Sequence, residues 1–277
     1  MITGKTKLIA QLGYPTEPFR APMVYNPYFE KHGIDAVVVP MGVTSENYAA
    51  FLPLLFRLSN IHGALVSMPH KVTTIALLDE VMPTAQVAGS CNAVRLDAGG
   101  RLVGDIFDGE GFVRGLRRKG RRTEGARALV VGAGGVGSAI AASLARAGVG
   151  HLGLFDAHAG MVEALAGRLR RHHPALEVAT GSNDPVGCDI VVNATPLGTK
   201  AGDPLPVEVE RIDPGAFVGE VVMKHEITPF LAAARARGCQ YQVGADMLFE
   251  QIPAYLEFFG LPTTTAEELR RLARLGG

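Results

Sequence analysis

A glycine-rich segment near the middle of the chain joins an apolar run to a run of small residues. Residues 128–131 predict a buried strand, and the small residues from 138 onward predict a helix. The turn between them reads Gly132-Ala133-Gly134-Gly135-Val136-Gly137. At this spacing the first glycine permits a tight turn, the second lets the backbone approach a pyrophosphate, and the third lets the helix pack closely on the strand. The segment predicts a dinucleotide-binding turn; the alternative is a βαβ unit with a glycine-rich connection and no ligand.

An acidic residue after the next predicted strand bears on the choice of dinucleotide. Residues 152–155 predict that strand, and Asp156 ends it, 19 residues after Gly137. An acid at this position binds the 2′-hydroxyl of the adenosine ribose and repels the 2′-phosphate of NADP. We therefore expect the cofactor to be NAD rather than NADP.

Composition excludes several classes of protein. The 277 residues are 47% hydrophobic, which is enough for the cores of two domains, and 27 Lys and Arg balance 27 Asp and Glu. The basic run at 114–122 lacks interleaved aromatic residues, so we expect a solvated surface rather than a nucleic-acid site. Cys91, Cys188 and Cys239 have no metal-ligand spacing. With neither a leader nor a membrane span in the pattern, we expect a cytoplasmic monomer or homodimer that binds a small molecule, with no metal, membrane or nucleic acid.

Short apolar runs and helical patterns extend on both sides of the glycine turn. Before it we expect strands at 7–13, 35–41 and 63–68, a hairpin of 91–96 with 102–105, and helices at 21–31, 46–58 and 108–119, with Ser45 as an N-cap. After it we expect strands at 190–193, 216–222 and 240–243, a helix at 246–259, and a last helix that the capping box at Thr265 begins. The turn therefore belongs to a second α/β module, and a separate α/β module precedes it.

Two charged residues at ends of predicted strands are candidates for proton transfer. Lys71 ends the segment Ser67-Met68-Pro69-His70-Lys71, which follows a strand, where open α/β sheets bind ligands. Asp108 lies at a strand-to-helix junction. A lysine and an aspartate that face one hydroxyl would form a proton-handling pair suited to alcohol oxidation. The alternatives are a solvated lysine at a helix start and an aspartate that only caps a helix.

The chain resembles the shikimate/quinate dehydrogenase family over nearly its whole length. The resemblance rests on motifs that occur in this order: Gly13-Tyr14-Pro15 with Pro22, Ser67-x-Pro69-x-Lys71, Gly89-Ser90-Cys91-Asn92, Gly104-x-x-x-Asp108-Gly109, the glycine turn, Asn193-Ala194-Thr195, Thr228-Pro229-Phe230, and Gly244-x-x-Met247-Leu248-x-x-Gln251. Their order is the specific part, because any one of them alone carries little weight.

The resemblance implies an α/β fold of two domains with an active-site cleft at their junction. An N-terminal substrate domain (1–107) is completed by C-terminal helices (244–277), and a Rossmann NAD-binding domain (108–243) is inserted between them. The resemblance makes Lys71 the catalytic lysine and Asp108 its partner. Residues that bind substrate would be Ser67, Asn92 and Gln251, together with Phe19, Ala21 and Met223 at pocket positions. Residues that bind the cofactor would be Gly132, Ala133, Gly134, Gly135, Val136, Gly137, Asp156, Asn193, Ala194, Thr195, Val221 and Gly244.

Several pocket positions depart from the family's pattern. The family's Ser-x-Ser, which holds the substrate carboxylate, is replaced by Phe19-Arg20-Ala21. Ile106-Phe107 replaces an Asn-Thr, Leu65 an Asn, and Met223 a tyrosine. Because these changes remove polar contacts, we expect a substrate with fewer hydroxyl groups than shikimate. Arg20, His70 and Lys224 are candidates for a different anion anchor; the alternative for each is ordinary surface charge.

The expected activity is reversible hydride transfer between a secondary hydroxyl of a small, cyclic hydroxy acid and NAD. Such enzymes serve aromatic amino acid biosynthesis in the family. A non-catalytic protein that senses NAD or a ring acid is the alternative from another class, and retention of both Lys71 and Asp108 argues against it. A reductase acting on a different carbonyl compound differs from the first hypothesis only in its substrate.

Overall fold

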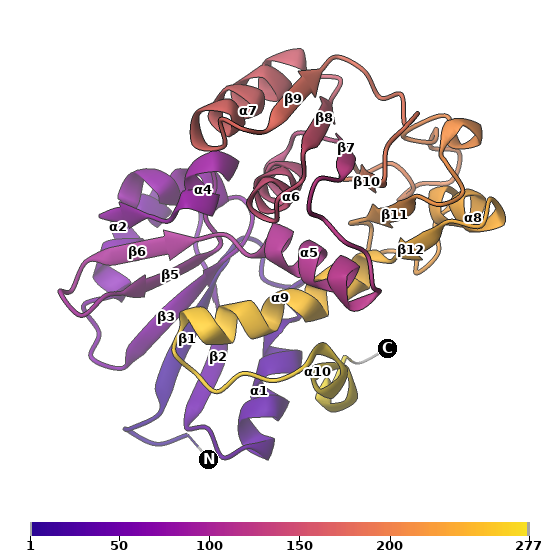
Figure 1. The fold of residues 1–277 in the computed structure, drawn as a ribbon. Helices are drawn as coiled ribbons and strands as arrows, with labels where there is room; N and C mark the ends of the chain where they lie inside the picture. The colour runs from indigo at the N-terminus through magenta and orange to yellow at the C-terminus, as the bar shows by residue number, and fades with distance from the viewer. Residues whose placement is uncertain (1, 276–277) are drawn as a thin grey trace. The chain divides into compact units, whose positions relative to one another are not determined.

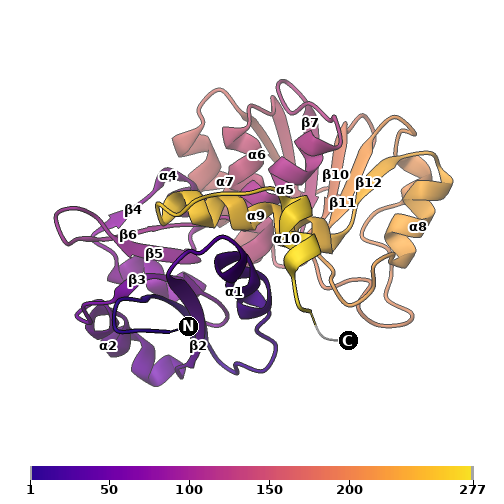
Figure 2. The same ribbon diagram turned by 90° about the horizontal axis from the view of Figure 1, so that it is seen from below.

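The computed structural model of the chain describes residues 2–275 as a mixed α/β protein (Figures 1 and 2). Within these residues the chain forms two compact units, each with its own sheet of six strands. Unit 1 comprises the chain up to residue 85, residues 90–107 and the chain from residue 252. Unit 2 comprises residues 86–89 and 108–251. Residues 244–251, which the sequence assigned to the substrate domain, therefore pack with unit 2.

The sheet of unit 1 has the order β2-β1-β3-β5-β6-β4. Its strands are β1 (Lys7–Gly13), β2 (Ala36–Gly42), β3 (Ile61–Val66), β4 (Glu80–Val81), β5 (Ala93–Leu96) and β6 (Leu102–Asp105). β1 pairs in parallel with β2 and with β3, whereas β5 runs antiparallel to both β3 and β6. The carboxyl ends of the three parallel strands consequently lie at one edge, and the segment from Ser67 to Lys71 begins there.

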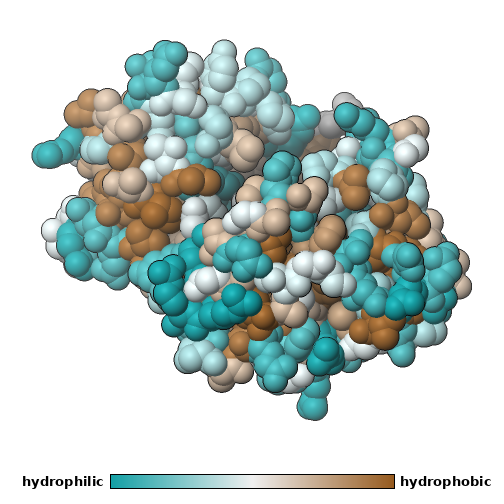
Figure 3. All heavy atoms as spheres, turned by 90° about the horizontal axis from the view of Figure 1, so that it is seen from above, coloured by the Kyte–Doolittle hydropathy of each residue, from teal (hydrophilic) through white to brown (hydrophobic). Residues whose placement is uncertain are grey.

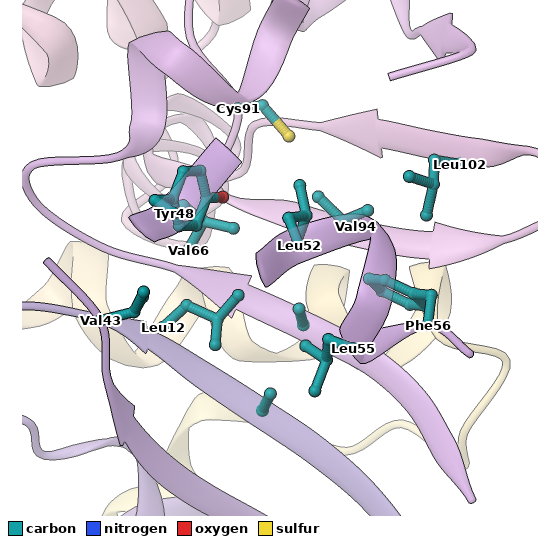
Figure 4. Close-up of a cluster of buried hydrophobic side chains, with 12 residues drawn as sticks. Leu12, Val43, Tyr48, Leu52, Leu55, Phe56, Val66, Cys91, Val94 and Leu102 are labelled. Atoms are coloured by element: carbon teal, nitrogen blue, oxygen red, sulfur yellow. The ribbon is translucent and has the colours of Figure 1, made fainter. Parts of the chain in front are cut away.

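Helices cover both faces of this sheet. On one face, α2 (Ser45–Leu55) packs Tyr48, Leu52 and Leu55 onto buried residues of β1, β3 and β5, as Figure 4 shows. On the other face lie α1 (Ala21–Lys31), α10 (Ala266–Leu272) and the last turns of α9 (Gly244–Phe258). There the Tyr28 hydroxyl donates to the Pro262 carbonyl at 2.7 Å. A Cβ on Gly63 would lie 2.4 Å from the Phe259 ring, so that ring lies directly on β3.

The sheet of unit 2 is parallel throughout, with the order β12-β11-β10-β7-β8-β9. Its strands are β7 (Arg127–Val131), β8 (His151–Phe155), β9 (Glu177–Thr180), β10 (Ile190–Asn193), β11 (Phe217–Glu220) and β12 (Gln240–Gln242). In chain order this is 3-2-1-4-5-6 from the β9 edge, the Rossmann arrangement. The order reverses between β7 and β10, and such a switch point is where doubly wound sheets bind ligands.

Helices also cover both faces of the second sheet, and Figure 1 labels them. α5 (Asp108–Arg118), α6 (Gly135–Arg146) and α7 (Ala159–His172) lie on one face, and α8 (Pro229–Ala236) lies on the other. α5 packs closely on α6 at Gly109. A Cβ at this position would lie 2.0 Å from the Ala139 carbonyl oxygen of α6, so the close packing requires glycine. A Cβ on Gly219 of β11 would likewise lie 2.6 Å from the Phe112 ring.

Most of the expected elements are present within one to three residues of their predicted bounds. The prediction of Ser45 as an N-cap is wrong: Thr44 is the cap, because its backbone is still extended at φ −74° and ψ 159°, and Ser45 is the first helical residue. Thr265 is confirmed as an N-cap, since its hydroxyl accepts from the Glu268 N–H at 3.2 Å. The Glu268 carboxylate accepts from the Thr264 hydroxyl instead of completing a capping box. The sequence did not predict β4, α4 (Pro83–Ala88) or β9.

Polar and apolar residues alternate over the face drawn in Figure 3. Among residues 2–275, no helix has the length and apolar character needed to cross a membrane.

Candidate active site

Lys71 begins the short helix α3 (Lys71–Thr74) in unit 1, and backbone hydrogen bonds fix its position. The Lys71 carbonyl accepts from the Cys91 N–H at 2.8 Å. Just upstream, the Ser67 N–H donates to the Leu12 carbonyl at 2.8 Å, and the His70 N–H donates to the Ser67 carbonyl at 3.0 Å. The segment from Ser67 to Lys71 is thus tied to β1 on one side and to the Cys91 segment on the other. Burial raises the pKa of the Cys91 thiol to about 12, so it stays protonated at neutral pH.

Asn92 is fixed beside the same segment and carries an unused donor. Its carbonyl accepts from the Val66 N–H at 2.8 Å, and its side-chain oxygen accepts from the Phe107 N–H at 3.0 Å. The side chain is almost fully buried, at 1% exposure. Its Nδ2 has no hydrogen-bond partner among the residues that the structure describes. A buried amide left unpaired costs about 1 to 3 kcal/mol, so this geometry favours a ligand that accepts a hydrogen bond here.

The prediction that His70 is a candidate anion anchor is wrong. It is 1% exposed, its ring Nε2 lies 2.7 Å from the Val43 carbonyl oxygen, and its ring stacks on Tyr48. A side chain enclosed in this way cannot meet an external anion. Of the other two candidates, Arg20 donates to the Glu17 carbonyl at 3.2 Å, and Lys224 donates to the Thr199 carbonyl at 3.1 Å.

The remaining residues of unit 1 that the sequence assigns to a pocket lie near the carboxyl end of β1. Gly13 ends that strand, and a Cβ there would lie 2.7 Å from Phe19 Cζ and 3.1 Å from Ser67 Cβ. Phe19 and Ser67 therefore flank the same point of the backbone. Ala21 is the first residue of α1 and is half-buried.

In unit 2, the glycine turn has the geometry that the sequence predicts. Gly132 has φ +109°, and a Cβ there would lie 2.7 Å from the carbonyl group of Ala194. A Cβ on Gly137 would lie 1.9 Å from the Gly132 carbonyl oxygen. By contrast, nothing lies within 4 Å of the corresponding points on Gly134 and Gly135. The backbone is therefore packed tightly at the first and last glycines and is open at the two between them, which begin α6.

Asp156 is bound to the same turn. Its Oδ2 accepts from the Ala133 N–H at 2.8 Å, and its Oδ1 accepts from the His158 N–H at 2.9 Å. Partial burial raises the pKa of this carboxyl, but the two N–H donors outweigh that effect and lower the pKa below its ordinary value. The side chain is a fixed anion at the end of β8, directly beside the glycine turn.

The other expected cofactor residues continue this surface along the switch-point edge. Asn193 ends β10, and its side-chain oxygen accepts from both the N–H and the hydroxyl of Thr195. The Val221 N–H donates to the Asn193 carbonyl at 3.2 Å. A Cβ on Gly244 would lie 2.2 Å from the Val222 carbonyl oxygen. Open backbone at Gly134 and Gly135, a fixed acid and the ends of β10 and β11 together suit a dinucleotide.

Three further predicted residues belong to unit 2. Asp108 is the first residue of α5 and is 5% exposed. Gln251 lies on α9 at 9% exposure, with its side-chain oxygen unpaired within the described residues. Met223 follows β11 and is 60% exposed.

The sequence did not single out Glu220, the last residue of β11. It is fully buried, and its Oε2 accepts from the Thr228 hydroxyl at 2.8 Å. Burial raises the pKa of its carboxyl from 4.5 to about 7. In the sequence Glu220 resembles any other acid at the end of a strand. Its apolar neighbours were the one signal of burial.

Comparisons with known proteins agree with this fold. The profile of the family described as "Shikimate dehydrogenase substrate binding domain" matches residues 12–94, and that of the "ThiF family" matches residues 115–159. The shikimate dehydrogenase (NADP(+)) of Rhodospirillum rubrum is 34% identical over 277 residues, covering 98% of both chains.

Two solved structures extend the similarity to three dimensions. The shikimate 5-dehydrogenase of Listeria monocytogenes, solved with shikimate and NAD, is 27% identical with a TM-score of 0.91, covering 98% of this chain and 97% of that one. The 5-ketofructose reductase of Gluconobacter sp. strain CHM43 is 26% identical with a TM-score of 0.88, covering 98% of this chain and 99% of that one.

The similarity to these dehydrogenases over nearly the whole chain, together with the dinucleotide-type turn, identifies an oxidoreductase of the NAD(P)-dependent class. The chain belongs to the shikimate dehydrogenase family.

Proposed function

We propose that the protein catalyses reversible hydride transfer between a secondary hydroxyl of a small cyclic hydroxy compound and a nicotinamide dinucleotide. The observation that carries this proposal is Asn92, whose Nδ2 is buried and unpaired within the described residues. Its segment is bonded to Val66 and, through the Cys91 N–H, to the Lys71 carbonyl. Together Asn92, Ser67 and Lys71 provide a hydrogen-bond donor, a hydroxyl and an amine at one strand edge. The hydroxy acids shikimate and quinate are the first substrates to test, because similar proteins carry these names.

We assign each residue one task. Lys71 takes the proton of the reacting hydroxyl, and Asp108 orients that hydroxyl. Ser67, Asn92 and Gln251 position the rest of the substrate through hydrogen bonds. A bound nicotinamide dinucleotide supplies the hydride acceptor, and the cofactor residues of unit 2 hold it. The family membership and the order of motifs support these assignments.

We propose NAD as the preferred cofactor. Asp156 supports this, because a fixed anion at the end of β8 favours a free ribose 2′-hydroxyl and disfavours a 2′-phosphate. The Rhodospirillum relative is named for NADP(+), whereas the Listeria structure contains NAD, so both cofactors occur among similar proteins. The cysteines among the described residues are free, as expected in a reducing compartment, and we propose the cytoplasm.

A second candidate is a reductase for a different carbonyl compound. The similarity to 5-ketofructose reductase favours it, as does the replacement of polar pocket positions by Phe19 and Met223. This candidate keeps the same residues in the same tasks and changes only the substrate.

Replacement of Lys71 tests the proposal. Lys71→Met should lower kcat by about 10²- to 10⁴-fold while the affinity for NADH, measured by fluorescence, stays unchanged. Lys31→Met, which changes an exposed lysine at the end of α1, is the matched control and should retain full activity. Undiminished turnover in the Lys71 variant would show that Lys71 does not transfer the proton. Binding of ring compounds without turnover in the wild type would favour a sensor.

A further inference from the structure

Phe19 places an aromatic ring on the substrate side of β1. The Phe19 N–H donates to the Thr16 carbonyl at 3.0 Å, which closes a turn after β1. That turn brings Phe19 Cζ within 2.7 Å of the point where a Cβ on Gly13 would lie. The same point is 2.8 Å from the Met68 carbonyl oxygen and 3.1 Å from Ser67 Cβ. The ring tip therefore lies against the backbone beside Ser67, on the segment that leads to Lys71.

Large apolar side chains on the neighbouring segments are exposed. Tyr14, Met68 and Val72 are 58%, 69% and 66% exposed. The Tyr14 N–H donates to the Met68 carbonyl at 3.1 Å, which holds these two segments together, and Val72 directly follows Lys71. Exposed apolar side chains next to the candidate site are available to contact an apolar group of a ligand. We call Tyr14, Phe19, Met68 and Val72 the apolar rim.

None of the four side chains of the apolar rim carries a positive charge. The arginine next to Phe19 in the chain, Arg20, donates its Nη1 to the Glu17 carbonyl at 3.2 Å. His70 is enclosed by Tyr48 and Val43. A carboxylate set against the Phe19 ring would lose water there, and the ring itself donates no hydrogen bond in return, which is costly. An uncharged substrate group therefore suits this position better than a charged one.

We propose that Phe19 determines specificity, and that the substrate presents an uncharged, apolar group to the rim while its hydroxyl or carbonyl oxygens face Asn92 and Lys71. The substrate class is a neutral alicyclic hydroxy or keto compound rather than a free carboxylic acid. This inference rests on the proposed function, since it concerns the substrate of the same site.

Shikimate and its methyl ester test this inference, because they share the ring and its hydroxyls and differ only in charge and one methyl group. Wild-type kcat/KM should be at least about tenfold higher for the ester. Phe19→Leu, the matched control, should keep that preference. Phe19→Ser should lower kcat/KM for the ester by about tenfold and bring the ratio toward one. Circular dichroism and thermal melting verify that each variant is folded.

A binding measurement separates failure of this inference from failure of the proposed function. The Lys71→Met variant is titrated calorimetrically with each compound in the presence of NADH. Tighter binding of the ester, with turnover of neither compound by the wild type, would uphold the apolar rim and overturn the proposed dehydrogenase. Turnover or binding of shikimate equal to or better than that of the ester would overturn the rim alone. Binding of neither compound would overturn the assignment of the rim to the substrate.

Discussion

His70 stacks on Tyr48 with ring centroids 3.9 Å apart and ring planes 2° from parallel. The Tyr48 hydroxyl lies 2.7 Å from the Thr74 hydroxyl, which in turn donates to the His70 carbonyl at 2.8 Å. Together with the His70 Nε2 contact to Val43, these bonds connect α2 to the residue before Lys71. α3 is four residues long and cannot hold its own first residue, so this buried network does.

Variants of Tyr48 separate the ring from its hydroxyl. Tyr48→Phe keeps the stack and loses one hydrogen bond, so we expect a destabilisation of about 1 kcal/mol. Tyr48→Leu also removes the ring, and we expect about 3 kcal/mol together with a lower kcat, because the start of α3 loosens. Urea unfolding measures the loss of stability in both variants, and steady-state kinetics measures the change in kcat. Equal losses of stability in both variants would mean that the stack contributes nothing.

The sequence could predict the elements of this fold but not the role of His70. Apolar runs such as those of β1 and β10 set strand bounds locally, and both strands have the predicted ends. His70 instead takes its role from Val43, which is 27 positions away, and from Tyr48 on another helix. No local pattern reveals such a partnership. From the sequence, His70 was either a candidate anion anchor or ordinary surface charge, whereas tertiary packing buries its ring.

The glycine turn allows three substitutions with different expected results. Gly137→Ala should destabilise unit 2 by about 3 kcal/mol or more, because its Cβ would meet the Gly132 carbonyl oxygen at 1.9 Å. Gly135→Ala has open space and should leave stability equal or slightly higher. Gly134→Ala should leave stability unchanged but weaken NADH binding, since its Cβ would point into the space proposed for the pyrophosphate. Thermal melts and NADH fluorescence titrations measure both properties. Unchanged NADH affinity in Gly134→Ala would place the pyrophosphate elsewhere.

The cofactor residues were more accessible to sequence reasoning than the substrate residues. Glycine spacing and a following acid are local signals, and the structure brings Ala133 and Asp156 together as such a turn requires. Phe19 lies in a loop after β1, and its ring contacts Gly13 at a point that also meets Ser67 and Met68. These contacts join segments that are far apart in the sequence. The substitution of apolar for polar residues was visible in the sequence, whereas the point that the ring contacts was not.

Asp156 carries the expected cofactor preference. Asp156→Asn keeps an acceptor for the Ala133 N–H and removes the charge, so we expect kcat/KM for NADP to rise by about tenfold relative to NAD. Glu210→Gln is the control, because it removes one negative charge from an exposed residue of unit 2 and leaves the hydrogen bonds of Asp156 in place. Ratios of kcat/KM for the two cofactors, measured with one substrate, give the answer. A wild type that prefers NADP would refute the role of Asp156.

Glu220 makes the stability of the protein depend on pH. Burial raises the pKa of this carboxyl to about 7 in the folded state, against 4.5 when it is free. The folded state therefore binds this proton more tightly than the unfolded state does. The resulting stabilisation is complete below about pH 4.5 and is lost as the pH rises through about 7.

Glu220→Gln isolates this effect, because glutamine still accepts from the Thr228 hydroxyl and never ionises. The free energy of unfolding of the wild type should fall relative to this variant between pH 5 and pH 8, by at most about 3 kcal/mol. Urea unfolding of both proteins across that range measures the difference. Glu226→Gln, in an exposed position of the loop after β11, should stay within about 0.5 kcal/mol of the wild type. A difference between Glu220→Gln and the wild type that does not change with pH would show that Glu220 does not titrate in this range.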